Sequence, residues 1–139
     1  HSVTFIWEQA FDECTGMKGI FFMGNAPSFS GSWTLGAYHP TGYYLPGTTG
    51  WGATFAGQPM VLWNPLIQSS GPDFGVGPAG FSFNITGNTN IPIVVEAATN
   101  PANANWVALQ SLNLTNGTVY FNDPNWVAFP TRHYRIRSP

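Results

Sequence analysis

Short apolar runs interrupted by glycine, proline and small polar residues dominate this chain. Sixteen Gly and twelve Pro are spread over its 139 residues, and together with Asn, Ser and Thr they break the apolar runs every ~8 to 12 residues. Helices need longer stretches with a 3.6-residue period, whereas short strands joined by turns tolerate this pattern. The sequence therefore predicts an all-β fold, of one domain or a small module with a partial second unit.

Strand alternation is clearest in the C-terminal half. From Ala79 onward, the segments "FSFNIT", "IPIVVEAA", "NWVALQSL", "TVYFND" and "RHYRIRSP" are separated by turn-forming residues. In "IPIVVEAA" the alternation places Ile93 and Val95 on one face, and Val94 and Glu96 on the other. This spacing predicts a small antiparallel β-sandwich of five or six strands over 79–139. Its predicted core consists of Phe81, Phe83, Ile85, Ile93, Val95, Trp106, Phe121, Tyr134 and Ile136.

The first part of the chain has a different pattern. Residues 1–45 begin with a short turn or helix around Trp7 to Phe11, followed by a polar turn and a strand at Gly19 to Met23. Such a unit cannot bury its apolar side alone, so it must pack on neighbouring repeats or on the rest of the chain. Residues 46–78 are rich in Gly, Pro and aromatics, and we expect them to form a long irregular connection.

The spacing in the first segment resembles one BspA-type leucine-rich repeat, with a pattern of the form "AF..CT.L..I.....N". The matching positions are Ala10, Phe11, Cys14, Met17, Ile20 and Asn25. Together with the last sixty residues, the layout resembles the C-terminal region of secreted bacterial BspA-like repeat proteins. The resemblance implies a leucine-rich-repeat remnant on a β-sandwich, in a secreted or cell-surface adhesion protein. An unpaired repeat edge further predicts a homodimer.

Charge and composition exclude several classes of partner. Only 7% of residues are charged and the net charge is −2, so the chain lacks the basic surface of a nucleic-acid-binding protein. The longest apolar stretches are far shorter than the ~18 to 20 residues of a membrane span. The single cysteine, Cys14, excludes an intramolecular disulfide. A surface built from amides and hydroxyls is typical of secreted β-proteins, and we expect the chain to be extracellular.

Arginines concentrate near the C-terminus. In "RHYRIRSP", alternation places Tyr134 and Ile136 on one face and Arg135 and Arg137 on the other, with His133 on the arginine side. Glu96 points away from its apolar neighbours, which predicts a cross-strand pair with Arg135. The simplest interpretation is a charged edge strand that discourages association. The alternative is that Arg135 and Arg137 bind an anion or an acidic glycan.

Tryptophans are the second group of candidate binding residues. Several of the six tryptophans lie beside turns, where flat rings can be displayed to stack on sugars while nearby amides contact hydroxyls. Small β-folds also fill their cores with aromatic rings, so core packing is the competing interpretation. Trp33, Trp51 and Trp126 are the first candidates for a carbohydrate platform.

Evidence for catalysis is weaker. A glycosidase would need two of the six carboxylates to face each other, and sequence cannot supply that distance. His1 with His39 or His133 would suit copper, but an arbitrary chain boundary explains His1 better. No residue is therefore assigned to catalysis, to a cofactor or to a metal. The predicted function is non-catalytic binding or capping, with a polysaccharide or a surface protein as partner; a carbohydrate-binding module and a small secreted carbohydrate-active enzyme are the alternatives.

Overall fold

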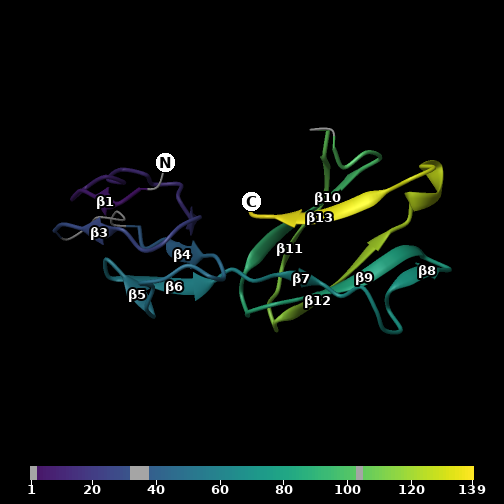
Figure 1. Ribbon diagram of the computed structural model, residues 1–139, viewed down its shortest axis with the longest axis horizontal. Helices are drawn as coiled ribbons and strands as arrows, with labels where there is room; N and C mark the ends of the chain where they lie inside the picture. The colour runs from purple at the N-terminus through teal and green to yellow at the C-terminus, as the bar shows by residue number, and fades with distance from the viewer. Residues whose placement is uncertain (1–2, 32–37, 103–104) are drawn as a thin grey trace. The chain divides into compact units, whose positions relative to one another are not determined.

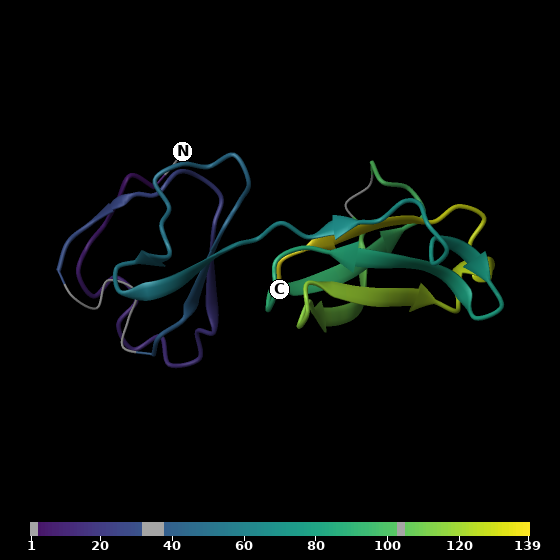
Figure 2. The ribbon, with the colours of Figure 1, turned by 90° about the horizontal axis from the view of Figure 1, so that it is seen from below.

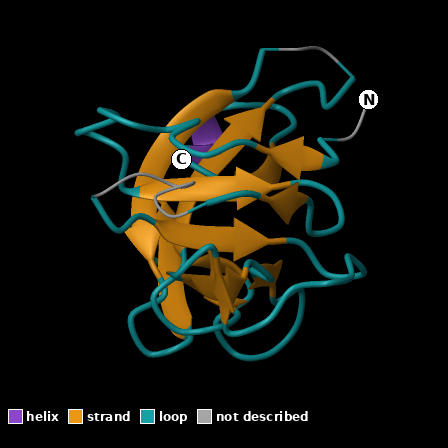
Figure 3. Ribbon diagram, turned by 90° about the vertical axis from the view of Figure 1, so that its left-hand side faces the viewer, coloured by secondary structure: helices purple, strands orange, loops and turns teal. Residues whose placement is uncertain are grey.

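The protein is all-β, as the sequence predicts. The computed structural model describes residues 3–31, 38–102 and 105–139, and its described part contains strands, loops and one short 3₁₀ helix but no α-helix (Figures 1 and 3). The chain divides into two compact units, His1–Asn64 (unit 1) and Pro65–Pro139 (unit 2) (Figure 2). The glycine- and proline-rich sequence thus folds into short strands, because its frequent turn residues end each strand after a few positions.

Unit 1 is built mainly from parallel strands. They are β1 (Phe5–Ile6), β2 (Gly19–Phe22), β3 (Ser28–Phe29), β4 (Thr41–Tyr44), β5 (Thr54–Phe55) and β6 (Gln58–Leu62). The pair β1–β3 and the series β2–β4–β6 are parallel, and only β5 pairs antiparallel, with β6. Parallel neighbours cannot be joined by a tight hairpin, so the chain must travel around between them.

The pairing register shows that unit 1 winds as successive coils. Phe5 pairs with Ser28 and Gly19 with Thr41, so both pairs are separated by about 22 residues. The expected strand at Gly19–Met23 is confirmed as β2 (Gly19–Phe22), while the segment around Trp7 to Phe11 forms turns rather than a helix. The first segment therefore packs on the following coil of the same chain. The sequence shows only one copy of the repeat pattern, because the second coil follows a similar backbone path without the residues of that pattern.

Apolar side chains fill the interior of unit 1. Ile6, Phe55 and Met60 are buried there, and half-buried residues including Phe22 and Trp51 pack against them. Glycine at position 42 leaves room for this core, since a Cβ there would overlap the Met60 sulfur.

Unit 2 is an antiparallel β-sandwich. Its elements are β7 (Leu66–Ile67), β8 (Gly75–Gly77), β9 (Gly80–Thr86), β10 (Pro92–Ala98), β11 (Val107–Asn113), β12 (Thr118–Asp123), η1 (Trp126–Ala128) and β13 (His133–Arg137). One sheet has the order β12-β9-β7, with β8 also pairing with β9; the other has the order β11-β10-β13. The predicted sandwich is therefore present, and it includes two strands, β7 and β8, from before Ala79.

Aromatic rings join the two sheets of unit 2. Tyr134 of β13 stacks on Phe81 of β9, with 5.2 Å between ring centroids, and its ring edge meets Phe83 and Phe121 at 5.5 and 6.0 Å. Phe83 and Phe121 are almost fully buried. The alternation of "FSF" and "RHYRIR" thus predicts correctly which side chains meet in the core.

Two expectations about this half of the chain are wrong. The connection expected over 46–78 does not exist as one segment: 46–64 belong to unit 1, where they supply β5 and β6, and 65–78 supply β7 and β8 of unit 2. Trp106 does not join the core, because its ring lies over Arg135 on the opposite face of the sheet. Ile91 and Leu114, which flank the strands, are fully buried instead.

Candidate functional site

A charged cluster covers the outer face of the sheet β11-β10-β13. In the register of β10 and β13, Glu96 lies opposite Arg135 and Val94 lies opposite Arg137. Arg135 Nε donates to Glu96 Oε2 at 2.8 Å, and Arg137 Nε donates to Glu96 Oε1 at 2.5 Å. One carboxylate thus holds two guanidinium groups. We call Glu96, Arg135, Arg137 and Trp106 the arginine face.

Glu96 is more buried than its sequence context predicts. The cross-strand pair with Arg135 is confirmed, but Glu96 is only 5% exposed, because β10 is the middle strand and both arginine side chains lie over it. The hydrogen bond from Arg137 is the largest of the effects that hold the pKa of Glu96 below its ordinary value; burial opposes it, and Arg135 adds to it. The carboxylate therefore stays ionised and keeps both guanidinium groups in place.

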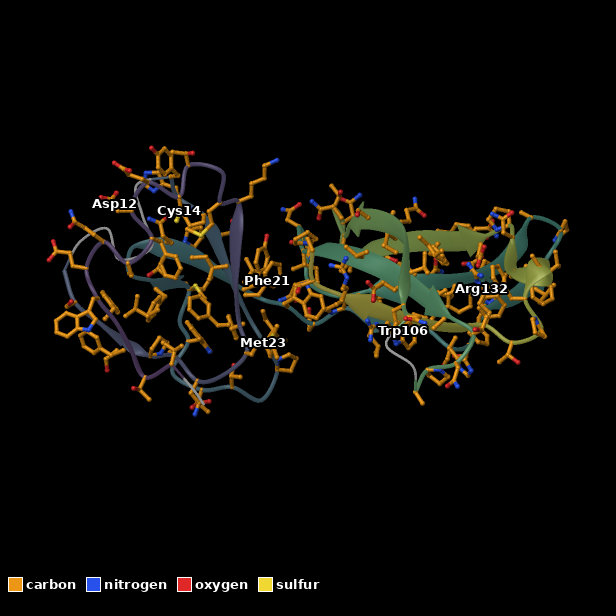
Figure 4. All side chains as sticks on the ribbon, turned by 90° about the horizontal axis from the view of Figure 1, so that it is seen from above. Asp12, Cys14, Phe21, Met23, Trp106 and Arg132 are labelled. Carbon is orange, nitrogen blue, oxygen red and sulfur yellow. The ribbon has the colours of Figure 1, made fainter. Side chains whose placement is uncertain are left out.

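Trp106 completes the face. The Arg135 guanidinium carbon lies 4.2 Å from the centroid of the indole ring. Trp106 is labelled in Figure 4. Such cation–π stacking restricts the motion of both side chains. Sequence reasoning missed this role, although alternation contains the signal: Trp106 and Ala108 lie two positions apart, and Ala108 is the partner of Glu96 on β10. Only the pairing of β11 with β10 shows that Trp106 and Ala108 lie on the same face of the sheet as Glu96.

Four of the five residues predicted to bind a ligand lie in the described part of the chain. Arg135 and Arg137 lie together on the arginine face, with side chains 47% and 43% exposed. Trp51 instead packs in the core of unit 1, stacked on Tyr44 and bonded through its indole N–H to the Gly24 carbonyl. Trp126 is half-buried in η1, and Trp33 lies outside the described residues. Core packing thus accounts for Trp51, as the competing interpretation expects.

A second ion pair lies at the end of the same sandwich. Arg132 Nε is 2.6 Å from Asp123 Oδ2, a close ionic contact without hydrogen-bond alignment, and the Tyr134 hydroxyl donates to the same oxygen at 3.0 Å. The Asn125 backbone N–H donates to Asp123 Oδ1. Burial, followed by the hydrogen bond to Asp123, raises the pKa of Tyr134 to about 12. Arg132 is labelled in Figure 4.

Two of the six carboxylates are buried and four are exposed. The two buried carboxylates, Glu96 and Asp123, are each held by arginine, and Glu8, Asp12 and Glu13 lie exposed on unit 1. A general acid in a glycosidase needs a raised pKa, whereas that of Glu96 is lowered. Within the described ranges, no group of three His, Cys, Asp or Glu residues could hold a metal ion. His1, considered for copper, lies outside them.

Comparisons with protein-family models, curated proteins and solved structures gave no match. In the described part of the chain, no helix is long and apolar enough to cross a membrane.

The lowered pKa of Glu96 predicts that the protein loses stability in acid. Because its folded-state pKa lies below the ordinary value of 4.5, its ion pairs stabilise the fold above that value, and the contribution is lost as the pH falls through the folded-state pKa. Thermal unfolding of the wild type and of Glu96→Gln should therefore differ most near neutral pH and converge in acid. A constant difference in melting temperature from about pH 7 to about pH 3 would contradict this assignment.

Proposed function

We propose that this chain is a non-catalytic binding module of a secreted or cell-surface repeat protein, and that the arginine face contacts its ligand. Two exposed guanidinium groups with one shared carboxylate carry a net positive charge, in a protein whose overall charge is −2. Guanidinium groups bind carboxylate and sulfate groups well, because their planar N–H donors match these anions. The ligand is therefore expected to carry such groups.

The observation that carries this proposal is the clamp formed by Glu96. It positions Arg135 and Arg137 before any ligand arrives, while the Trp106 ring stacks on the Arg135 guanidinium. The two arginine side chains then lose less conformational entropy when a ligand binds, which favours affinity. A charged edge strand that only prevents association would need no such fixed geometry.

Unit 1 supports the repeat-protein part of the proposal. Its strands pair in parallel at separations of 18 to 23 residues, as in solenoids, whose units stack one on the next. In this proposal unit 1 is the last part of a BspA-like repeat array, and unit 2 follows it as a terminal module. The leucine-rich-repeat assignment rests on the sequence resemblance, and the coil geometry is compatible with it.

A small carbohydrate-active enzyme is the less favoured alternative. Its general acid would have to be protonated near neutral pH, but the arginines stabilise Glu96 in its ionised form. To compare the two, the protein is incubated with soluble and insoluble polysaccharides, both neutral and acidic, and we expect depletion of the protein from solution without release of sugar products. Product release would instead support the enzyme.

The contribution of the arginine face can be measured with one charge-removing variant. Arg137→Gln should weaken binding to a carboxylated polymer by about tenfold to a hundredfold, because a charge-assisted hydrogen bond contributes ~1.5 to 3 kcal/mol. Lys18→Gln, which removes one positive charge from an exposed position in unit 1, is the matched control. Equal loss of affinity in both variants would indicate nonspecific attraction rather than a defined face. Circular dichroism checks that both variants are folded.

A further inference from the structure

A small pocket lies at the end of β10, near Ala98, which is two residues beyond Glu96. It has a volume of about 230 Å³ and combines polar and apolar side chains. Ala98 of β10 forms part of its wall, and the strand partner of Ala98 is His133. Because Ala98 and Glu96 are two positions apart, they share one face of the strand. Ala97 and Val107, which are partners across β10 and β11, also line the pocket and lie on the other face of the sheet. The pocket is therefore lined by residues of both faces and lies at the end of the strand, beside Arg132.

Arg132 lines this pocket and is already fixed in position. Its Nε is buried against Asp123, and its guanidinium carbon lies 3.8 Å from the centre of the Phe129 ring. The side chain is only 11% exposed. With Nε covered, the terminal guanidinium nitrogens are the polar groups that Arg132 can offer to a ligand. A preformed donor of this kind suits a carboxylate oxygen.

The other walls of the pocket match a sugar ring. Thr99 and Asn105 supply a hydroxyl and an amide, while Val107 and Phe129 supply apolar surface. A pyranose has the same two kinds of surface, an apolar face and a rim of hydroxyl groups. Protein sites for small ligands commonly combine apolar walls with a few fixed polar groups.

We propose that this pocket binds one acidic sugar residue of a uronate-containing polysaccharide, with the carboxylate on Arg132. The inference rests on the proposed binding function and names its ligand class. An acidic peptide is less well suited, because its carboxylates would be satisfied on the open arginine face and would make no use of a sugar-sized pocket.

The test is calorimetric titration of the full chain with a uronate trisaccharide and with a neutral trisaccharide of the same linkage. Val107→Phe adds bulk at the pocket, at a residue that is 62% exposed and therefore tolerant of substitution. The control, Val76→Phe, makes the same change at an exposed position of β8. We expect uronate binding that weakens by about tenfold or more in Val107→Phe, because the ring occupies the ligand's space, and that is unchanged in Val76→Phe.

The outcomes separate this inference from the proposed function. Uronate binding that is weakened by Arg137→Gln but not by Val107→Phe would overturn the pocket and leave the arginine face as the binding surface. Equal affinity for the neutral trisaccharide would overturn the acidic ligand class. Binding of polyglutamate but of neither trisaccharide would overturn the inference in favour of an acidic protein partner. No binding to any acidic polymer would overturn the proposed function as well.

Asn105→Ala is a second variant at the pocket, for which we expect a smaller loss of uronate affinity than for Val107→Phe.

Discussion

Replacing Asp123 by alanine should destabilise unit 2 by about 3 to 5 kcal/mol, the cost typical of removing one partner from a buried ion pair. Asp123 is 4% exposed and its carboxylate contacts Arg132, Tyr134 and the backbone N–H of Asn125. Without it, the Arg132 guanidinium would remain almost fully buried with no counter-charge. A buried arginine without a partner is therefore the main reason for the loss.

Measurement of this effect must report on unit 2 alone, since a chain with two compact units need not unfold in one step. Amide hydrogen exchange in β9 and β10 gives that local free energy. Asp73→Ala is the control, because Asp73 is exposed and makes one side-chain hydrogen bond with Asn84. A loss below ~1 kcal/mol in Asp123→Ala would show that the buried pair is not important for stability.

Tyr134 offers an independent readout in the same variant. Its pKa is raised to about 12 by burial and then by Asp123. Removing Asp123 eliminates the second cause, so the ultraviolet absorbance titration of this phenol should move to lower pH if unit 2 remains folded. An unchanged titration would mean that burial alone sets the pKa.

The second large effect is expected for Phe83→Ala, which should cost about 3 to 5 kcal/mol. Phe83 is 1% exposed and its ring contacts Phe121 and Tyr134, which come from different sheets of the sandwich. Truncation removes apolar contacts from both sheets and leaves a cavity that a two-layer fold can close only by moving one sheet. The loss should therefore appear in the exchange rates of β9 and β10 together.

Tyr120→Ala is the matched control for Phe83→Ala. It removes an aromatic ring from β12, the strand next to β9, but Tyr120 is 51% exposed. We expect a loss below ~1 kcal/mol, because little buried area changes. If both variants lost the same stability, inter-sheet packing at Phe83 would not be the main source of stability in unit 2.

Parts of the site could be predicted because they depend on strand alternation alone. The period of two in "IPIVVEAA" and "RHYRIRSP" places Glu96, Arg135 and Arg137 opposite to the core residues, and the pair Glu96–Arg135 follows if β10 and β13 are neighbours. The burial of Glu96 and its second arginine could not be predicted. They depend on β10 being the middle strand, and strand order is decided by contacts between residues far apart in the chain.

The boundary between the two units could not be predicted from the sequence either. Residues 46–78 have few apolar alternations, so sequence predicts a connection, yet both units recruit short strands from them. Three of these strands, β5, β7 and β8, have only two or three residues and carry almost no periodic signal. They exist because a neighbouring strand offers an edge to pair with. Such strands can be predicted only when that neighbour is already placed.

By itself, the sequence determined the all-β class, the C-terminal sandwich and the sides of its strands, because turn residues and a period of two act locally. The tertiary structure alone decided the coil of unit 1, the boundary after Asn64, the place of Trp106 over Arg135 and the pocket at Arg132. Each of these depends on register, and register brings together residues that no local pattern connects.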